Sequence, residues 1–534
     1  SDLTTWSTPL HFADENYPAI ALHWPALALN PAKSHRAAMV WVNLPTMYEA
    51  QAFFDGAWRS DTGYPDCEPG FPLDLQSQPI SPPAVVDVDG DGDLEIVYSE
   101  TGRIQVLDHD GDPLPGWPVS TGVNLADGPV AVGDLTGNGE VAIVAGGTDG
   151  KAYAYDRHGD PLPGWPSTII ASAQPVYVSI GDLGGTYRRL VVAASTGGLV
   201  FRNYRGVLPT GTHGWQVPGG GACLAPAAIG DTDDDGTAEV VCAFGSELLI
   251  TALAPATTPI ILDLGADASD APTLGDVDGN GDVEIFVPLA DGRLLGLQGN
   301  GTTLAGSWPF DAGSGGALTS AALSEMLDEA GPELVVASKY QQVHLVHADG
   351  QESPHFPQST GAGWFILGAP IVGPVNNTVP DIILGSRDKK LYAWTNVGFL
   401  LEGYPRPVDG RVNLSPAQGD LDLDGSQEVV LLTDSQLLVM DLSVGVYLPE
   451  QNWPMYGYDA RRSGCYNCPE DAATPVDPAG DGVTRVSFAP PNPNPTRGAT
   501  VFDFAIPQAA VVSLDIHDLR GRRVCRIHRR EAQA

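Results

Sequence analysis

The chain has 534 residues, and 66 aspartates and glutamates against 27 lysines and arginines give it a formal net charge of −39. So negative a protein repels phosphate backbones and attracts cations, which argues against nucleic acid as a partner. Its 63 glycines and 46 prolines favour many short strands joined by tight turns over long helices. The composition therefore indicates an all-β protein.

The N-terminal residues 1–35 contain no repeated motif, and we interpret them as an extended or capping segment. Ser1, Asp2 and Leu3 lack the basic start and apolar core of a signal peptide, so we expect a mature, processed product. No stretch approaches the roughly 18 to 20 apolar residues of a membrane span. We therefore expect a secreted chain with no membrane span.

An acidic loop followed by a glutamate and an apolar run recurs along the chain. Clear copies begin at Asp87, Asp134, Asp182, Asp231, Asp276 and Asp420, with weaker ones at Glu325 and Pro374. The spacings of 47, 48, 49, 45, 49, 49 and 46 residues match the period of a four-stranded propeller blade. We predict a β-propeller of about eight four-stranded blades over residues 36–468, or seven if a degenerate copy merges with its neighbour.

Each copy predicts three antiparallel strands, such as 129–132, 141–145 and 151–156. The fourth is expected around phrases such as Pro115-Gly116-Trp117-Pro118, whose aromatic side chain would pack between neighbouring blades. Gly70-Phe71-Pro72 resembles this phrase but follows no acidic loop. Residues 36–75 are therefore expected to supply strands that close the ring.

Four of the loops carry oxygen-bearing side chains at positions 1, 3, 5 and 9. These candidate metal ligands are Asp87, Asp89, Asp91 and Glu95; Asp231, Asp233, Asp235 and Glu239; Asp276, Asp278, Asn280 and Glu284; Asp420, Asp422, Asp424 and Glu428. Converging carboxylates repel one another unless a hard cation lies among them, and Ca²⁺ accepts six to eight oxygens. We predict about four structural calcium ions and a weaker fifth site at Asp134, Thr136 and Asn138.

The repeated D-x-D-x-D-G-x-x-E over residues 76–464 resembles the bacterial FG-GAP/VCBS-type calcium-binding β-propeller family. The stretch from Asn452 to Asp459 looks like the closing phrase that such propellers carry. The resemblance implies an extracellular or cell-surface location and a role in binding or adhesion. Fold alone does not set function, because members include lectins, surface proteins and accessory domains of enzymes.

After Cys468, residues 469–486 form a linker rich in proline, alanine and aspartate. Residues 487–534 resemble the first half of a C-terminal FlgD-Ig-like or type IX secretion sorting module, a partial β-sandwich-like segment. We predict strands at 501–506 and 511–516 and a third at 523–527. So few strands rarely fold alone, so we expect this segment to dock on the propeller, to stay disordered or to drive self-assembly through strand exchange.

The six cysteines are too few to build a fold from disulfides. Cys223 and Cys242 lie on the strands that flank one acidic loop, and we expect them to be close enough to bridge. Cys465 and Cys468 form a lone C-x-x-C, which we interpret as a local disulfide or an unpaired thiol.

The leading hypothesis for function is a calcium-stabilised propeller that binds or scaffolds glycans or proteins at one face. One alternative is a polysaccharide-active enzyme of the lyase-like eight-bladed kind, and another is a structural subunit of a surface layer or fibre. No nucleophile elbow, H-E-x-x-H or phosphate loop occurs, so we do not expect an enzyme.

Overall fold

The computed structural model describes residues 67–466, apart from 137, 184–188, 209–214, 217–220, 254–257, 314–315, 328–330, 362–364, 376–378 and 443–451. In the C-terminal part it describes the backbone of residues 487–488, 504–505, 510–517 and 523–532. The chain divides into two compact units, Ser1–Cys468 and Pro469–Ala534. The predicted N-terminal segment 1–35 and linker 469–486 lie outside the described residues. No helix long and apolar enough to cross a bilayer occurs in the described part.

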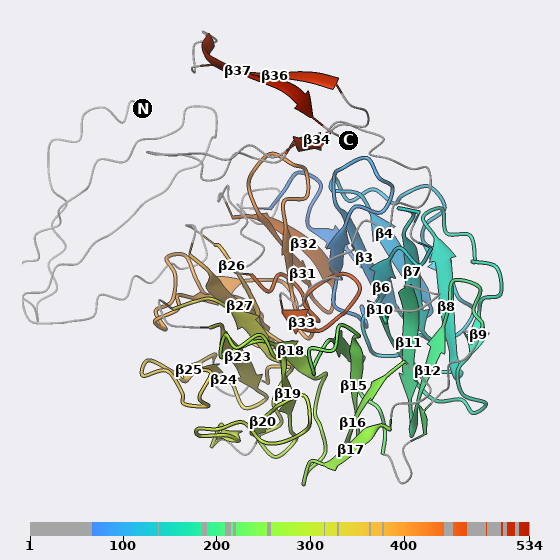
Figure 1. Ribbon diagram of the computed structural model, residues 1–534, viewed down its shortest axis with the longest axis vertical. Coiled ribbons are helices and arrows are strands. Elements are labelled where there is room, and N and C mark those ends of the chain that lie inside the picture. The colour runs from blue at the N-terminus through green and yellow to red at the C-terminus, as the bar shows by residue number, and fades with distance from the viewer. Residues whose placement is uncertain are drawn as a thin grey trace, which may run out of the picture. The chain divides into compact units, whose positions relative to one another are not determined.

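The first unit is an eight-bladed β-propeller (Figure 1). Its described residues form eight blades of four antiparallel strands, which in blades 1–7 follow one another in the chain from the inner to the outer edge. Blades succeed one another around the ring in chain order. The predicted fold class is confirmed, and the count is eight because even the degenerate copies at Glu325 and Pro374 build complete sheets.

The strands are short, as the many glycines and prolines predict. The innermost strands are β2 (Ala84–Val86), β6 (Ala131–Gly133), β10 (Tyr177–Asp182), β14 (Ala228–Gly230), β18 (Thr273–Gly275), β22 (Ala322–Ser324), β26 (Ile371–Gly373) and β30 (Ala417–Gly419). The second strands are β3 (Glu95–Glu100), β7 (Ala142–Gly146), β11 (Arg189–Ser195), β15 (Glu239–Phe244), β19 (Glu284–Pro288), β23 (Glu333–Ser338), β27 (Asp381–Ser386) and β31 (Glu428–Leu432). The third strands are β4 (Arg103–Leu107), β8 (Lys151–Asp156), β12 (Gly198–Arg202), β16 (Glu247–Ala252), β20 (Arg293–Leu297), β24 (Gln342–Val346), β28 (Lys390–Trp394) and β32 (Gln436–Asp441). The outer strands are β5 (Val119–Ser120), β9 (Ser167–Thr168), β13 (Trp215–Gln216), β17 (Ile260–Asp263), β21 (Phe310–Asp311), β25 (Gln358–Ser359), β29 (Arg406–Pro407) and β1 (Leu73–Asp74).

The two ends of the propeller meet in blade 8. Strand β1 comes from the N-terminal side and is the outer strand of this blade, paired with β32 through Leu73 opposite Leu437. Strand β1 lies within residues 36–75, which are predicted to close the ring, while residues 36–66 lie outside the described part. Closure therefore joins the beginning of the array to its end through main-chain hydrogen bonds.

Tryptophans of the repeated phrases connect three of the blades to the blade that follows, as predicted. Each indole is nearly buried and donates its Nε1–H to a backbone carbonyl in the following blade. These bonds run from Trp117 to Arg157, from Trp165 to Tyr204 and from Trp308 to Ala348, each at 3.0 Å. The phrase thus supplies both apolar area and one directional bond between sheets.

A single segment fills the axis of the ring, and we call residues 452–466 the axial plug. It ends in β33 (Cys465–Tyr466), which pairs in parallel with β18 and makes blade 5 five-stranded (Figure 1). Its hydrogen bonds reach all eight blades in turn, through Pro83, Val132, Ile180, Ile229, Leu274, Glu325, Val372 and Gln418. Because these residues lie on or beside the innermost strands, the plug occupies the centre.

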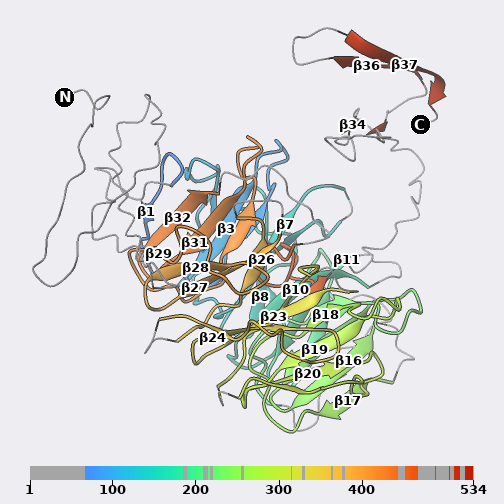
Figure 2. The ribbon, with the colours of Figure 1, turned by 90° about the vertical axis from the view of Figure 1, so that its left-hand side faces the viewer.

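The C-terminal unit contains two strand pairs in its described residues. Strands β34 (Ser487–Phe488) and β35 (Phe504–Ala505) pair, and β36 (Ala510–His517) pairs with β37 (Arg523–Ala532). Figure 2 shows the second pair as a two-stranded ribbon. These pairs overlap the three predicted strands, and the proposed dependence of this unit on a partner stays a prediction.

Candidate metal-binding loops

The acidic loops join the innermost strand of a blade to its second strand. Because the strands of a blade alternate in direction, these loops and the loops between third and outer strands lie at one end of every blade, which we call the acid-loop end. The opposite end, which carries the tight turns between second and third strands and the connections between blades, we call the hairpin end. All four predicted metal loops thus open on the same side of the ring.

Each of the four loops gathers three carboxylates. One oxygen from each member lies within 4.8 Å of the others in the groups Asp87, Asp89 and Glu95; Asp231, Asp233 and Glu239; Asp276, Asp278 and Glu284; Asp420, Asp422 and Glu428. The structure therefore brings together positions 1, 3 and 9 of every predicted loop. These are sites that could hold a metal ion.

The glutamate at position 9 begins the second strand and is almost completely buried. In each loop its Oε2 accepts the backbone N–H of position 2, and these bonds link Glu95 to Val88 at 2.5 Å, Glu239 to Thr232 at 2.9 Å, Glu284 to Val277 at 2.9 Å and Glu428 to Leu421 at 2.7 Å. This bond joins the end of the loop to its beginning and fixes the position of one glutamate oxygen.

Side chains at position 5 are not members of these groups. Each side-chain oxygen accepts the backbone N–H of the residue two positions further on. These bonds run to Asp91 from Asp93 at 3.0 Å, to Asp235 from Thr237 at 2.8 Å, to Asn280 from Asp282 at 2.6 Å and to Asp424 from Ser426 at 2.7 Å. In this geometry the position-5 oxygens stabilise the turn itself. Glycines in left-handed conformation, such as Gly90 and Gly92 with φ of 84° and 108°, make the tight winding possible.

Crowding of negative charge shows in the acidity of the buried glutamates. Burial, reinforced by the neighbouring aspartates, raises the pKa of Glu95, Glu239 and Glu284 to about 7 and the pKa of Glu428 to about 8. A positive charge among the carboxylates would favour their ionised form. The four loops are therefore electrostatically suited to a cation.

The donor set and its geometry fit a hard cation. All side-chain ligands are oxygens, which hard divalent cations prefer to nitrogen or sulfur. In the blade 8 loop, Asp420 Oδ1 is buried and has no hydrogen-bond partner among the described residues. An unpaired buried carboxylate oxygen is costly unless an ion satisfies it.

Two further acidic residues of blade 8, which were not predicted from the sequence, lie at this site. Glu68 and Asp441 form a further close group with Glu428, so five carboxylates gather there. Asp441 could have been found because it lies directly opposite Glu428 in the β31–β32 pair, but Glu68 arrives from outside the repeat. A recess of about 120 Å³ opens beside them and is also lined by His109 and Asp110.

The degenerate loops lack the aspartates but keep the hydrogen bond from the loop backbone to the acidic residue that begins the second strand. In blade 6 Glu333 accepts the N–H of Met326 at 2.9 Å, and in blade 7 Asp381 accepts that of Val375 at 3.2 Å. At the predicted weaker site the guanidinium of Arg189 lies 3.8 Å from the Asp134 carboxylate. No group of three acidic ligands forms there among the described residues.

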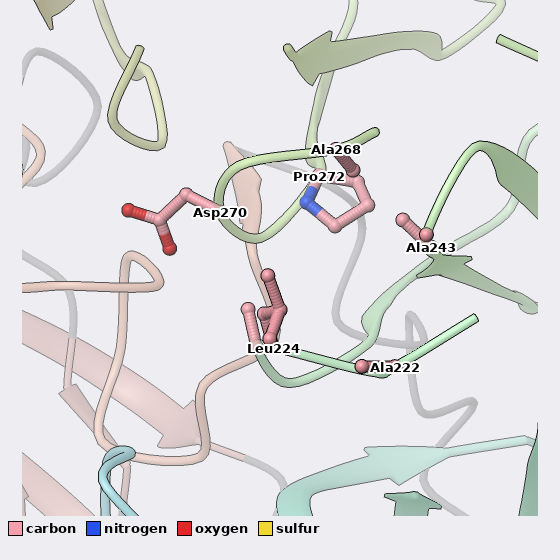
Figure 3. Close-up of a pocket in the computed structure, with 8 residues that line it drawn as sticks. Ala222, Leu224, Ala243, Ala268, Asp270 and Pro272 are labelled. Carbon is pink, nitrogen blue, oxygen red and sulfur yellow. The ribbon is translucent and has the colours of Figure 1, made fainter. Parts of the chain in front are cut away.

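A second recess lies at the hairpin end between blades 4 and 5. Figure 3 shows it framed by small apolar residues such as Ala222, Ala243 and Ala268, with the Asp270 carboxylate at its side. Its volume of about 10 Å³ holds one water molecule at most. Asp270 accepts the Tyr456 hydroxyl of the axial plug at 2.5 Å, so this carboxylate anchors the plug.

The structure also shows the surroundings of Cys223, Cys242 and Cys465, for which the sequence raises the question of disulfides. Cys223 and Cys242 are buried free thiols whose Sγ atoms lie 3.9 Å apart. Cys465 is disulfide-bonded, and Cys468 lies outside the described residues. The predicted proximity of the first pair is confirmed.

Fold and loops together define an eight-bladed β-propeller with four potential metal sites on one side of the ring. No protein-family model matches the chain, and no curated protein matches it. Among solved structures it is similar to BamB from Moraxella catarrhalis, with 14% identity and a TM-score of 0.47 over 70% of this chain and 99% of that one. It is also similar to the V. cholerae biofilm matrix protein Bap1, with 12% identity and a TM-score of 0.42 over 76% and 96%. The C-terminal WD40 domain of Sif2 gives 14% and 0.46 over 70% and 98%. With TM-scores below 0.5, these similarities carry no argument about function.

Proposed function

We propose that this protein is an extracellular or cell-surface propeller of the FG-GAP/VCBS type, stabilised by calcium, that binds or scaffolds glycans or proteins. The observation that carries the proposal is the gathering of three carboxylates within 4.8 Å in each of four loops at one end of the ring. The proposed role is binding and not catalysis. The disulfide at Cys465 agrees with an oxidising compartment.

Calcium is the cation that this geometry favours. Two oxygens at about 2.4 Å from one Ca²⁺ lie at most about 4.8 Å apart, so the oxygens of each group are close enough to share one ion, and Ca²⁺ accepts irregular carboxylate sets that the strict octahedral geometry of Mg²⁺ disfavours. Backbone carbonyls and water would complete the six to eight oxygens that calcium takes. Bound calcium supplies positive charge that holds the carboxylates together.

The residues at positions 1, 3 and 9 set the shape of each loop. Position 9 ties the end of the loop to its beginning through the N–H of position 2, and positions 1 and 3 turn their oxygens toward the same point. Because the loop leads into the buried second strand, an ordered loop fixes that strand in register. The expected outcome is a rigid ring whose faces present fixed side chains to a ligand.

Calcium dependence is tested by the double substitution Asp276→Asn with Asp278→Asn. We expect the number of bound calcium ions, measured by native mass spectrometry, to fall by one. At calcium about 100 times its Kd the lost site removes about 2.7 kcal/mol of stability. Asp311→Asn is the matched control, since Asp311 is exposed and belongs to none of the acidic groups, and it should leave the ion count unchanged. An unchanged melting temperature after complete calcium removal would refute the proposal.

The binding role is tested with the calcium-loaded full chain on glycan and polysaccharide arrays, with product analysis in the same samples. Saturable binding without new products supports a binding protein. Release of unsaturated oligosaccharides would replace this role with a lyase activity. Filaments in electron micrographs of the native material would instead favour the structural subunit.

A further inference from the structure

A compact surface at the hairpin end of blades 6 and 7 combines exposed rings with unpaired positive charge. We define the blade 6–7 patch as Tyr340, Phe365, Leu367, Arg387 and Lys389. Tyr340 lies in the turn between β23 and β24, Phe365 and Leu367 in the connection from β25 to β26, and the two cations in the turn between β27 and β28. Three separate segments of chain therefore build it.

The contacts show that these segments form one surface. The rings of Tyr340 and Phe365 lie 6.1 Å apart between centroids, and the backbone N–H of Arg387 donates to the Phe365 carbonyl at 3.4 Å. Ile366 is fully buried between Phe365 and Leu367, so its anchoring turns both neighbours outward. The Tyr340 ring lies so close to Gly316 that a Cβ there would meet it at 2.3 Å. The aromatic ring of Tyr340 therefore packs directly against the backbone at Gly316.

Exposure at this place is unusual for the molecule. Tyr340 is 52% exposed, Phe365 46% and Leu367 38%, and Phe399 is the one other strongly exposed aromatic ring among the described residues. Single exposed apolar side chains are ordinary, but adjacent ones that are held rigidly mark interaction sites. Planar rings with few rotatable bonds suit the apolar faces of pyranose sugars.

The charge of the patch opposes that of the whole chain. The sequence holds five lysines at a net charge of −39, and three of them, Lys339, Lys389 and Lys390, lie in the turns of blades 6 and 7. Lys390 pairs with Asp388 at 3.6 Å, whereas Arg387 and Lys389 have no acidic partner among the described residues. Unpaired cations beside exposed rings favour an anionic ligand.

We propose that the blade 6–7 patch binds an acidic polysaccharide, with uronic acid rings stacked on Tyr340 and Phe365 and their carboxylates paired with Arg387 and Lys389. This deepens the proposed binding function and rests on it. A polyanion approaching the acid-loop end would meet the carboxylates of four loops, whereas the blade 6–7 patch offers it two cations without an acidic partner among the described residues. Recognition is thereby assigned to the face opposite the calcium loops.

The test uses the calcium-loaded full chain, calorimetry, and two probes that differ only in charge. These probes are a soluble oligogalacturonate and the same oligosaccharide with its carboxylates reduced to alcohols. We expect the charged probe to bind and the reduced probe to bind at least about tenfold more weakly. The joint substitution Tyr340→Ala and Phe365→Ala should weaken binding of the charged probe by about tenfold or more, since central aromatic contacts dominate such interfaces. Lys389→Gln, which is exposed, should weaken it severalfold and flatten its salt dependence.

Phe399→Ala is the matched control, because this ring is 68% exposed but lies at the acid-loop end. It should bind the charged probe as the wild type does. The inference is overturned if the folded wild type ignores the oligogalacturonate, if both probes bind equally, or if the double alanine variant binds normally. It is also overturned if light scattering shows that the wild type forms a dimer and that Lys389→Glu is a monomer, which would make a second copy the partner. If the arrays instead show binding to a neutral glycan or to a protein, this inference is wrong and the proposed function stands. If the melting temperature does not depend on calcium, the proposed function itself is wrong.

Discussion

Arg462 in the axial plug offers a sharp test of what holds the ring together. Its side chain is 1% exposed and donates three hydrogen bonds, Nε to the Val130 carbonyl at 3.0 Å, Nη1 to Tyr456 at 2.6 Å and Nη2 to Pro83 at 3.2 Å. Val130 and Pro83 precede the innermost strands of blades 2 and 1. One guanidinium therefore ties the plug to the two blades beside it. The perturbation is Arg462→Met, which keeps length and apolar volume.

The size of the effect follows from two opposing terms. Hydrogen bonds from a charged donor contribute about 1.5–3 kcal/mol each, and the substitution also leaves three buried carbonyls without this partner. Against this stands the cost of burying the guanidinium, which lowers the pKa of Arg462 to about 10 and is relieved in the variant. At neutral pH the group is still protonated. We expect a net loss of about 3–5 kcal/mol in the free energy of unfolding.

Urea unfolding in saturating calcium, followed by tryptophan fluorescence, measures this loss. The control is Arg293→Met, since Arg293 pairs with Asp291 at 2.7 Å near the surface and exposed ion pairs contribute about 1 kcal/mol or less. An Arg462→Met variant within about 1 kcal/mol of the wild type would refute the reasoning. The contacts between blades would then be enough to hold the ring together, and the axial plug would contribute little to its stability.

Asp381→Asn should stabilise the propeller by about 2–4 kcal/mol above pH 7 and change little below about pH 4. The reason is that burial raises the pKa of Asp381 to about 7, so the folded state loses stability as the pH rises from the ordinary aspartate pKa to that value; parallel unfolding curves of both proteins from pH 4 to pH 8 would contradict this. Mild oxidation should join Cys223 to Cys242, whose sulfurs lie 3.9 Å apart, and add about 3 kcal/mol; peptide mapping without reductant that still finds two thiols would reject the bridge. Trp308→Phe should cost about 1–2 kcal/mol because the Ala348 carbonyl loses its donor, and a melting temperature equal to that of the wild type would show that the bond is dispensable.

Much of the fold could be predicted because its signals are local and periodic. The spacing of the acidic loops gave the number of blades, and the runs at 141–145 and 151–156 fall on β7 (Ala142–Gly146) and β8 (Lys151–Asp156). The phrase around Trp117 predicted both an outer strand and a contact between blades, since aromatic, glycine and proline recur at one place in each repeat. Positions 1, 3 and 9 of the loops converge as their alternation indicates.

What could not be predicted depends on contacts between distant segments. The segment 452–466 has no periodicity, and its partners are backbone groups of all eight blades, which leave no trace in residue type. Glu68 joins Glu428 only because β1 closes the ring beside β32. Position 5 is predicted as a ligand by its spacing, but its side chain is not a member of the close acidic groups, and the spacing does not reveal that one of its oxygens accepts a backbone N–H of the same loop.

The axial plug bears on the order in which the molecule can be completed. Inner strands of the blades expose unpaired edges toward the axis until residues 452–466 arrive, and these residues follow every blade in the sequence. A chain that is synthesised from its N-terminus therefore cannot finish its centre until the last blade is made. Strand β1 must likewise wait for β32 before blade 8 has its outer edge. Such a chain can remain open until the whole array is present together.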